Sequence, residues 1–86
     1  MTHALSAKLE RELAERFAPA DRRTAHVILM QYGVSPHERD VEHVRQAMLT
    51  LSGGQVGRLA YFLAAAQHRY QDVLFWGKHP DQAPQP

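Results

Sequence analysis

The 86-residue chain contains no cysteine, no asparagine and a single isoleucine, and aromatic residues make up only 8% of it. The lack of cysteine excludes a disulfide framework, a thiolate metal site and a cysteine nucleophile. The longest uninterrupted apolar run, Leu59 to Ala66, is much shorter than the ~20 residues that cross a bilayer. We therefore expect neither a membrane-spanning helix nor a membrane partner.

The net charge of the chain is also close to zero. Ten basic and nine acidic residues give a formal net charge of +1, which favours no particular class of partner. Hydrophobic residues make up 44% and charged residues 22%, a composition typical of a globular domain. Arginine greatly outnumbers lysine, which suggests a GC-rich bacterial genome. A signal peptide has an apolar core near its start, whereas charged residues follow soon after Met1. We therefore expect no signal peptide and a cytoplasmic location.

Helical periodicity dominates the chain, and no segment alternates with the period of a strand. The first expected helix runs from about residue 2 or 6 to 18, and the second from 19 or 21 to 32. Their apolar residues recur once per turn and predict the buried faces. These residues are Leu5, Leu9, Leu13 and Phe17 in the first helix, and Ala25, Ile28, Leu29 and Tyr32 in the second.

Two capping-box patterns predict where the later helices begin. Ser35-Pro36-His37-Glu38 opens the third, and Ser52-Gly53-Gly54-Gln55 opens the fourth, which ends near Trp76 with Gly77 as its stop. The expected inner faces are Val41, Val44, Met48 and Leu51, then Val56, Leu59, Ala60, Leu63, Ala66, Tyr70 and Leu74, with Gln67 among them. Short connections favour an all-α, small antiparallel bundle of four helices over residues 1–77. Because prolines recur in it, we expect the tail at 78–86 to be unfolded.

No residue pattern predicts catalysis or a cofactor. His37 and His43 are six residues apart, whereas a zinc helix needs two histidines four apart on one face. His68 and Asp72 have the spacing of a contacting helical pair, yet every serine is better explained as a cap than as a nucleophile. We expect no catalytic residue, metal, cofactor or small-molecule substrate.

Two other classes of function stay open. A helix-turn-helix regulator of nucleic acid would need Arg22, Arg23, Arg58 and Arg69 to converge on one face, and we do not expect it at this net charge. A metal-binding or catalytic bundle would need His37, His43 or His68 to converge in a concave pocket.

Excess apolar surface is the most informative feature of the sequence. Two of the expected helices carry apolar residues beyond the one face that a small bundle buries. Either the last helix is packed from two sides, or the second stripes bind another chain. On the second interpretation the protein is a non-enzymatic helical interaction module, a homo-oligomer or a small partner subunit. Its interface residues would be Val27, Met30, Tyr61, Ala65, His68, Asp72, Phe75 and Trp76.

Several short runs have a familiar pattern. They are Tyr32-Gly33, Pro36-His37-Glu38, Leu51-Ser52-Gly53-Gly54, Leu59 and the run from Arg69 to Trp76. Over roughly the last two-thirds of the chain, this pattern resembles short helical bacterial proteins of uncharacterised function. The resemblance implies a helical fold and transfers no activity or site.

Overall fold

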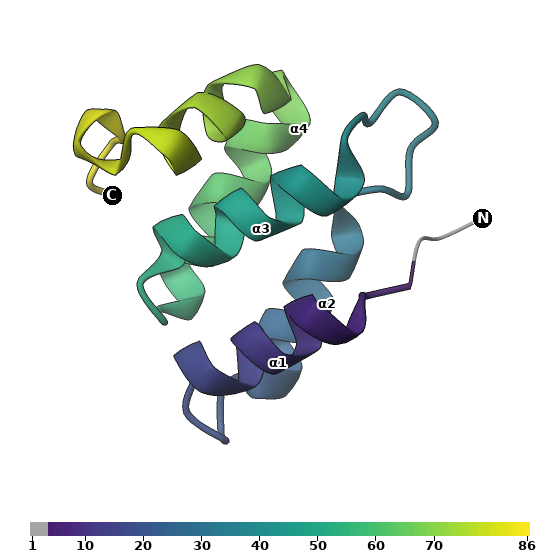
Figure 1. The fold of residues 1–86 in the computed structure, drawn as a ribbon, viewed down its shortest axis with the longest axis vertical. Helices are drawn as coiled ribbons and strands as arrows, with labels where there is room; N and C mark the ends of the chain where they lie inside the picture. The colour runs from purple at the N-terminus through teal and green to yellow at the C-terminus, as the bar shows by residue number, and fades with distance from the viewer. Residues whose placement is uncertain (1–3) are drawn as a thin grey trace.

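A computed structural model describes residues 4–86, and this part of the chain is all-helical (Figure 1). The elements are α1 (Ala7–Arg16), α2 (Arg22–Gln31), α3 (Val41–Ser52), α4 (Val56–Lys78) and a short 3-10 helix, η1 (Pro80–Gln82). The expected all-α class is confirmed for these residues. The possible start of the first helix at residue 2 lies outside them. Within the described range, no helix has both the length and the apolar character that a bilayer crossing requires.

The helices enclose one core in a body of 33 × 30 × 19 Å. The closest association is between α3 and α4, while α1 contacts both α2 and α3. Figure 1 shows α1 and α3 side by side on the near face, with α2 crossing behind α1. The far end of α4 turns back over α3, beside the C-terminus.

The apolar stripes predicted for the first two helices are all buried. In α3 and α4 the prediction is only partly confirmed, because Ala60 and Gln67 are exposed. Three residues absent from the predicted stripes, Leu49, Phe62 and Val73, are completely buried. The core comprises Leu5, Leu9, Leu13, Phe17, Ala25, Ile28, Leu29, Tyr32, Val44, Ala47, Met48, Leu49, Leu51, Leu59, Phe62, Leu63, Ala66, Val73 and Ala83.

The predicted start of the third helix is wrong by five residues, because the cap is Asp40 instead of Ser35. One bond of the capping box forms, since Ser35 N donates to Glu38 Oε1 (3.0 Å). The Ser35 hydroxyl accepts from His37 N (3.3 Å) instead of Glu38 N, which donates to Ser35 O. No helix follows them, because Asp40 adopts the left-handed conformation (φ 49°, ψ 46°) and α3 begins only after it. The motif therefore makes an isolated turn in the α2–α3 loop.

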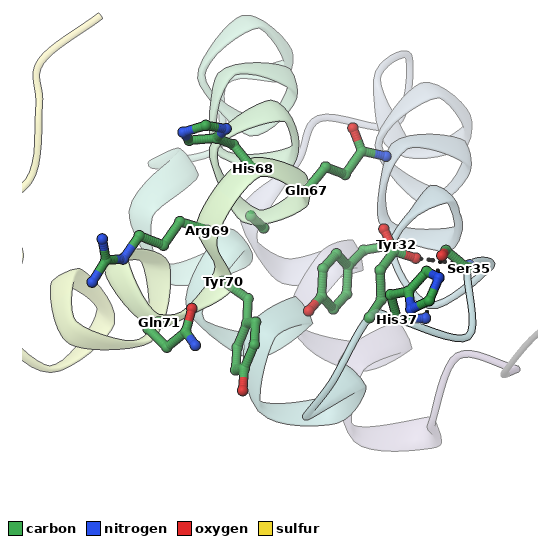
Figure 2. A pocket seen from close by; sticks show the side chains of 10 residues that line it. Tyr32, Ser35, His37, Gln67, His68, Arg69, Tyr70 and Gln71 are labelled. Atoms are coloured by element: carbon green, nitrogen blue, oxygen red, sulfur yellow. Dashed lines mark hydrogen bonds between the residues drawn. The ribbon is translucent and has the colours of Figure 1, made fainter.

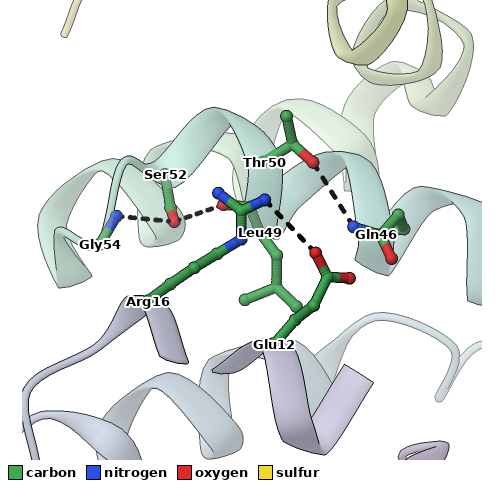
Figure 3. Close-up of polar contacts among 7 residues, drawn as sticks. All are labelled: Glu12, Arg16, Gln46, Leu49, Thr50, Ser52 and Gly54. Carbon is green, nitrogen blue, oxygen red and sulfur yellow. Dashed lines mark hydrogen bonds and ion pairs between the residues drawn. The ribbon is translucent and has the colours of Figure 1, made fainter. Parts of the chain in front are cut away.

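The α3–α4 turn lies where the second capping box predicted it, but its serine has a different role (Figure 3). Ser52 is the last residue of α3, and its hydroxyl donates to Leu49 O (2.7 Å) and accepts from Gly54 N (3.2 Å). Gly53 and Gly54 both have positive φ, as expected of a permissive turn. At Gly54 a Cβ would also collide with the backbone oxygen of Arg16, so this turn packs directly against the end of α1.

The expectation of an unfolded tail does not agree with the structure. Helix α4 continues past Gly77 to Lys78, and η1 follows it. Ala83 is buried and belongs to the core. Arg58 Nη1 donates to Gln85 Oε1 (3.2 Å), which ties the last residues to the first turn of α4. Proline spacing prevents a regular helix here, but it does not prevent docking.

Candidate functional site: the bend in α4 and the surfaces beside it

Helix α4 is broken near its middle. Arg69 has φ −157° and ψ 91°, an extended conformation inside an element that is helical before and after it. Sharp helix kinks almost always occur at proline, at glycine or serine pairs, or at bulges. The stretch from Ala64 to Asp72 contains no proline, glycine or serine, and alanine, glutamine and arginine in it favour a helix. The bend therefore has no cause in the local sequence.

The bend separates the residues that the sequence grouped into one interface stripe. Spacings of seven, four and three place Tyr61, His68, Asp72 and Phe75 on one face only if the helix is straight. Because Arg69 interrupts it, Tyr61 and Phe75 belong to two differently directed segments (Figure 1). Val27, Tyr61 and Phe75 are 51%, 41% and 51% exposed. His68 is exposed as well, whereas Met30, Ala65, Asp72 and Trp76 are partly buried.

The expected pairing of His68 with Asp72 is replaced by another contact. Arg69 Nε lies 3.5 Å from Asp72 Oδ1, an exposed ion pair across the bend. The bend disrupts the helical turn that would bring His68 and Asp72 together. Trp76 packs edge-on against Phe62 (ring centroids 6.1 Å apart), so this member of the predicted interface belongs partly to the core of its own chain.

A cavity of about 490 Å³ lies between the bend and the α2–α3 loop (Figure 2). Residues Ala66 to Gln71 form one wall, and residues of the loop form the other. His37 and His68 both line it, on opposite sides of the opening in Figure 2. His43 lies elsewhere, at a second cavity. Within residues 4–86, no three histidine, aspartate or glutamate side chains gather closely enough to hold a metal ion.

The loop wall of this cavity is held by three hydrogen bonds of two side chains, Tyr32 and Glu38. Tyr32 Oη donates to Arg39 O (2.7 Å), and Glu38 Oε1 accepts from the backbone N–H groups of Gly33 (2.7 Å) and Ser35. Burial raises the pKa of Tyr32 to about 12, and the nearby Glu38 carboxylate adds to the rise. The hydroxyl therefore keeps its proton at neutral pH and acts as a donor that fixes the loop.

Arg45 is a buried cation that the sequence analysis did not single out. It is 1% exposed, and its guanidinium donates to backbone oxygens at the end of α2. Nε donates to Leu29 O and Tyr32 O (both 3.1 Å), Nη2 to Tyr32 O (2.8 Å), and Nη1 to Ala4 O (3.4 Å). Burial lowers its pKa, although arginine stays protonated throughout the physiological range. A positive charge at a helix C-terminus is favourable, so Arg45 serves as the cap of α2.

One signal could have revealed Arg45. It follows Val41 by four residues and precedes Met48 by three, which places it inside the apolar stripe of its helix. A cation within such a stripe requires buried acceptors.

A second cavity, of about 450 Å³, lies between α3 and the distal part of α4. Its walls come from α3 (His43, Gln46, Ala47 and Thr50) and from Leu74, Gly77 and Lys78, with Asp40 at one end. At the wall of this second cavity the helices touch closely, because a Cβ on Gly77 would lie 2.8 Å from Ala47 Cβ. Figure 3 shows Gln46 Nε2 bonded to Thr50 Oγ1 along the same stretch of α3.

Of the four arginines proposed for nucleic acid, Arg23 is exposed and the other three make structural contacts. Arg22 Nε donates to Phe17 O (3.1 Å), and Arg58 donates from Nε and Nη2 to Leu51 O (3.3 and 3.1 Å). Arg69 pairs with Asp72 as described above. These guanidinium groups join segments of this chain to one another.

Comparisons of this chain with protein-family models, with curated proteins and with solved structures find no match. The resemblance to short helical bacterial proteins stays a prediction. Any proposal about function must therefore come from the residues and geometry of this chain.

Proposed function

We propose that the protein is a non-enzymatic helical interaction module that associates with a second copy of itself through α4 and the neighbouring surface of α2. One observation carries this proposal. The core is already filled by large side chains such as Phe17, Tyr32 and Phe62, yet Val27, Tyr61 and Phe75 remain 41–51% exposed. Large apolar side chains left exposed beside a filled core are typical of surfaces that bind another chain.

The charges of the molecule favour a second copy as the occupant. From Leu59 to His68, helix α4 carries no aspartate, glutamate, lysine or arginine, so two such helices can approach without like-charge repulsion. The net charge of +1 adds little repulsion between whole molecules. The exposed alanines at 60 and 64 beside Tyr61 permit a close approach of backbones.

The area that a stable dimer buries can be compared with the surface of this molecule. A stable dimer buries about 600–1,000 Å² on each partner. The described chain exposes 5321 Å², so the interface would cover roughly a ninth to a fifth of its surface. An interface formed by α4 together with α2 can supply this, and aromatic residues such as Tyr61 would contribute most of its free energy.

Sedimentation and light scattering across a dilution series test the proposal. We expect a concentration-dependent dimer, weakened at least tenfold in dissociation constant by the double replacement Tyr61→Ser and Phe75→Ser, because two exposed aromatic anchors are lost. The matched control is Arg11→Ser with Glu15→Ser, which changes two exposed residues of α1 and leaves the net charge unchanged. A wild-type protein that stays monomeric at high micromolar concentration contradicts the proposal, as does equal weakening by both double variants.

A further inference from the structure

We propose that α4 is a two-state helix, bent at Arg69 in the monomer and continuous in the dimer, where its distal segment docks on α3 of the second copy. The distal segment is defined as residues 70–86. This inference rests on the proposed self-association and adds the conformational change that produces it. It follows from the bend, from the cavities beside it and from the length of the helix.

The first argument is a conflict between local preference and packing. No proline, glycine or serine accounts for the bend between Ala64 and Asp72, and the residue types there favour a continuous helix. A helix break leaves backbone N–H and C=O groups without intrahelical partners, and a continuous helix would restore these bonds. Straightening therefore has a local advantage that only the docking of the distal segment opposes.

The second argument concerns how the distal segment is docked. Val73 and Ala83 are buried, Trp76 meets Phe62, and Gly77 lies against Ala47. Two cavities of about 490 and 450 Å³ border this docked segment, one at the bend and one between α3 and the end of α4. Close packing along the whole segment would brace it against movement, and these openings leave parts of its border unpacked.

The third argument is length. At 1.5 Å per residue, the 23 residues of α4 would extend about 34 Å if the helix were straight. The longest dimension of the folded molecule is 33 Å. A straight α4 would therefore be about as long as the whole molecule. Because straightening changes the direction of the distal segment at Arg69, it would move this segment off α3, exposing Val73 and uncovering the Ala47 surface. The distal segment of a second copy has the shape and chemistry to cover that surface, and the exchange is reciprocal.

Straightening has a further consequence for the predicted interface residues. In a continuous helix, the seven, four and three spacings again place Tyr61, His68, Asp72 and Phe75 on one face. The bent monomer divides this stripe between two segments. The dimeric state would thus both exchange the distal segment and form the continuous stripe.

Two variants at one exposed position test the hinge. Arg69→Ala and Arg69→Gly both remove the ion pair with Asp72, but alanine favours a helix over glycine by a factor of about five per residue. Because a dimer contains two hinges, we expect its dissociation constant to be roughly 20-fold lower for the alanine variant than for the glycine variant. Equal dissociation constants, or tighter association of the glycine variant, overturn the inference.

A distance measurement reads the bend directly. The chain has no cysteine, so Gln55→Cys with Lys78→Cys accepts spin labels at two exposed positions at the ends of α4. Labelled protein diluted into an excess of unlabelled protein reports distances within one chain. A straight helix separates these Cα atoms by about 35 Å, and the bent monomer gives a shorter distance.

The outcomes separate the two proposals. The long distance should increase with the dimer fraction. A dimer that retains the short distance overturns the two-state helix and leaves self-association standing. A protein that is monomeric at every concentration overturns both.

Discussion

Replacing Arg45 by methionine should come close to unfolding the protein. Methionine fills a similar elongated space but donates no hydrogen bond, so Leu29 O and Tyr32 O lose donors in a buried environment and Ala4 O loses one in a partly buried environment. Each buried acceptor left without a partner costs about 1–3 kcal/mol. The removed desolvation of the guanidinium offsets part of this, and the net loss should be about 3–5 kcal/mol.

That loss is large compared with the total free energy of unfolding expected for the protein. A chain of this length is stable by roughly 4–13 kcal/mol, at 0.05–0.15 kcal/mol per residue. Arg45→Lys is the matched control, because lysine keeps the charge but lacks the planar guanidinium that bonds several oxygens at once. This variant should lose about 1–3 kcal/mol of stability. Urea denaturation followed by circular dichroism measures both variants. A loss below 1 kcal/mol for methionine would refute the capping role assigned to this residue.

Three further predictions concern the glycines, the buried tyrosine and the tail. In urea denaturation, Gly57→Ala should stabilise the protein by about 0.5–1 kcal/mol and Gly77→Ala should destabilise it by about 1 kcal/mol. The reason is that only a Cβ on Gly77 meets a neighbour, and changes of stability with the same sign in both variants would contradict this. Because the pKa of Tyr32 is raised in the folded protein, the hydroxyl of Tyr32 loses its proton first in the unfolded chain. The contribution of Tyr32 to the free energy of unfolding is therefore complete below pH 10 and falls by about 2 kcal/mol towards pH 12. Denaturation over this pH range should show a smaller fall for Tyr32→Phe, and parallel falls would exclude the effect. Deleting residues 83–86 should lower the melting temperature through a loss of about 1 kcal/mol, because a buried methyl group and a hydrogen bond disappear; an unchanged melting temperature would mean that the tail does not dock.

The sequence predicted those parts of the fold that depend on helical periodicity. The stripe from Leu5 to Phe17 and the pattern of Ala25, Ile28, Leu29 and Tyr32 are buried as expected, because an apolar face of a helix is a local property that folding must cover. The turn at residues 53–54 was also located correctly from its glycines.

The errors lie where the backbone departs from what the local sequence favours. The predicted capping box at Ser35 makes a turn without starting a helix, because the left-handed Asp40 comes before α3. The bend at Arg69 has no local signal, so neither the divided stripe nor the loss of the pair between His68 and Asp72 could be predicted. Proline spacing in the tail excluded a helix but said nothing about the docking of Ala83.

Arg45 also bears on how the native structure comes apart. Its bond to Ala4 joins residues 41 positions apart in the sequence, and Ser6 Oγ adds a bond to Glu42 Oε2 (2.8 Å) in the same region. The N-terminal segment, the end of α2 and the start of α3 are thereby linked in one cooperative unit that must open together. The distal segment of α4 has no share in these bonds and can detach by a smaller, sub-global opening. Amide hydrogen exchange should therefore be faster beyond Arg69 than at the first turns of α3, which makes the C-terminal part of the molecule the region that opens first under native conditions.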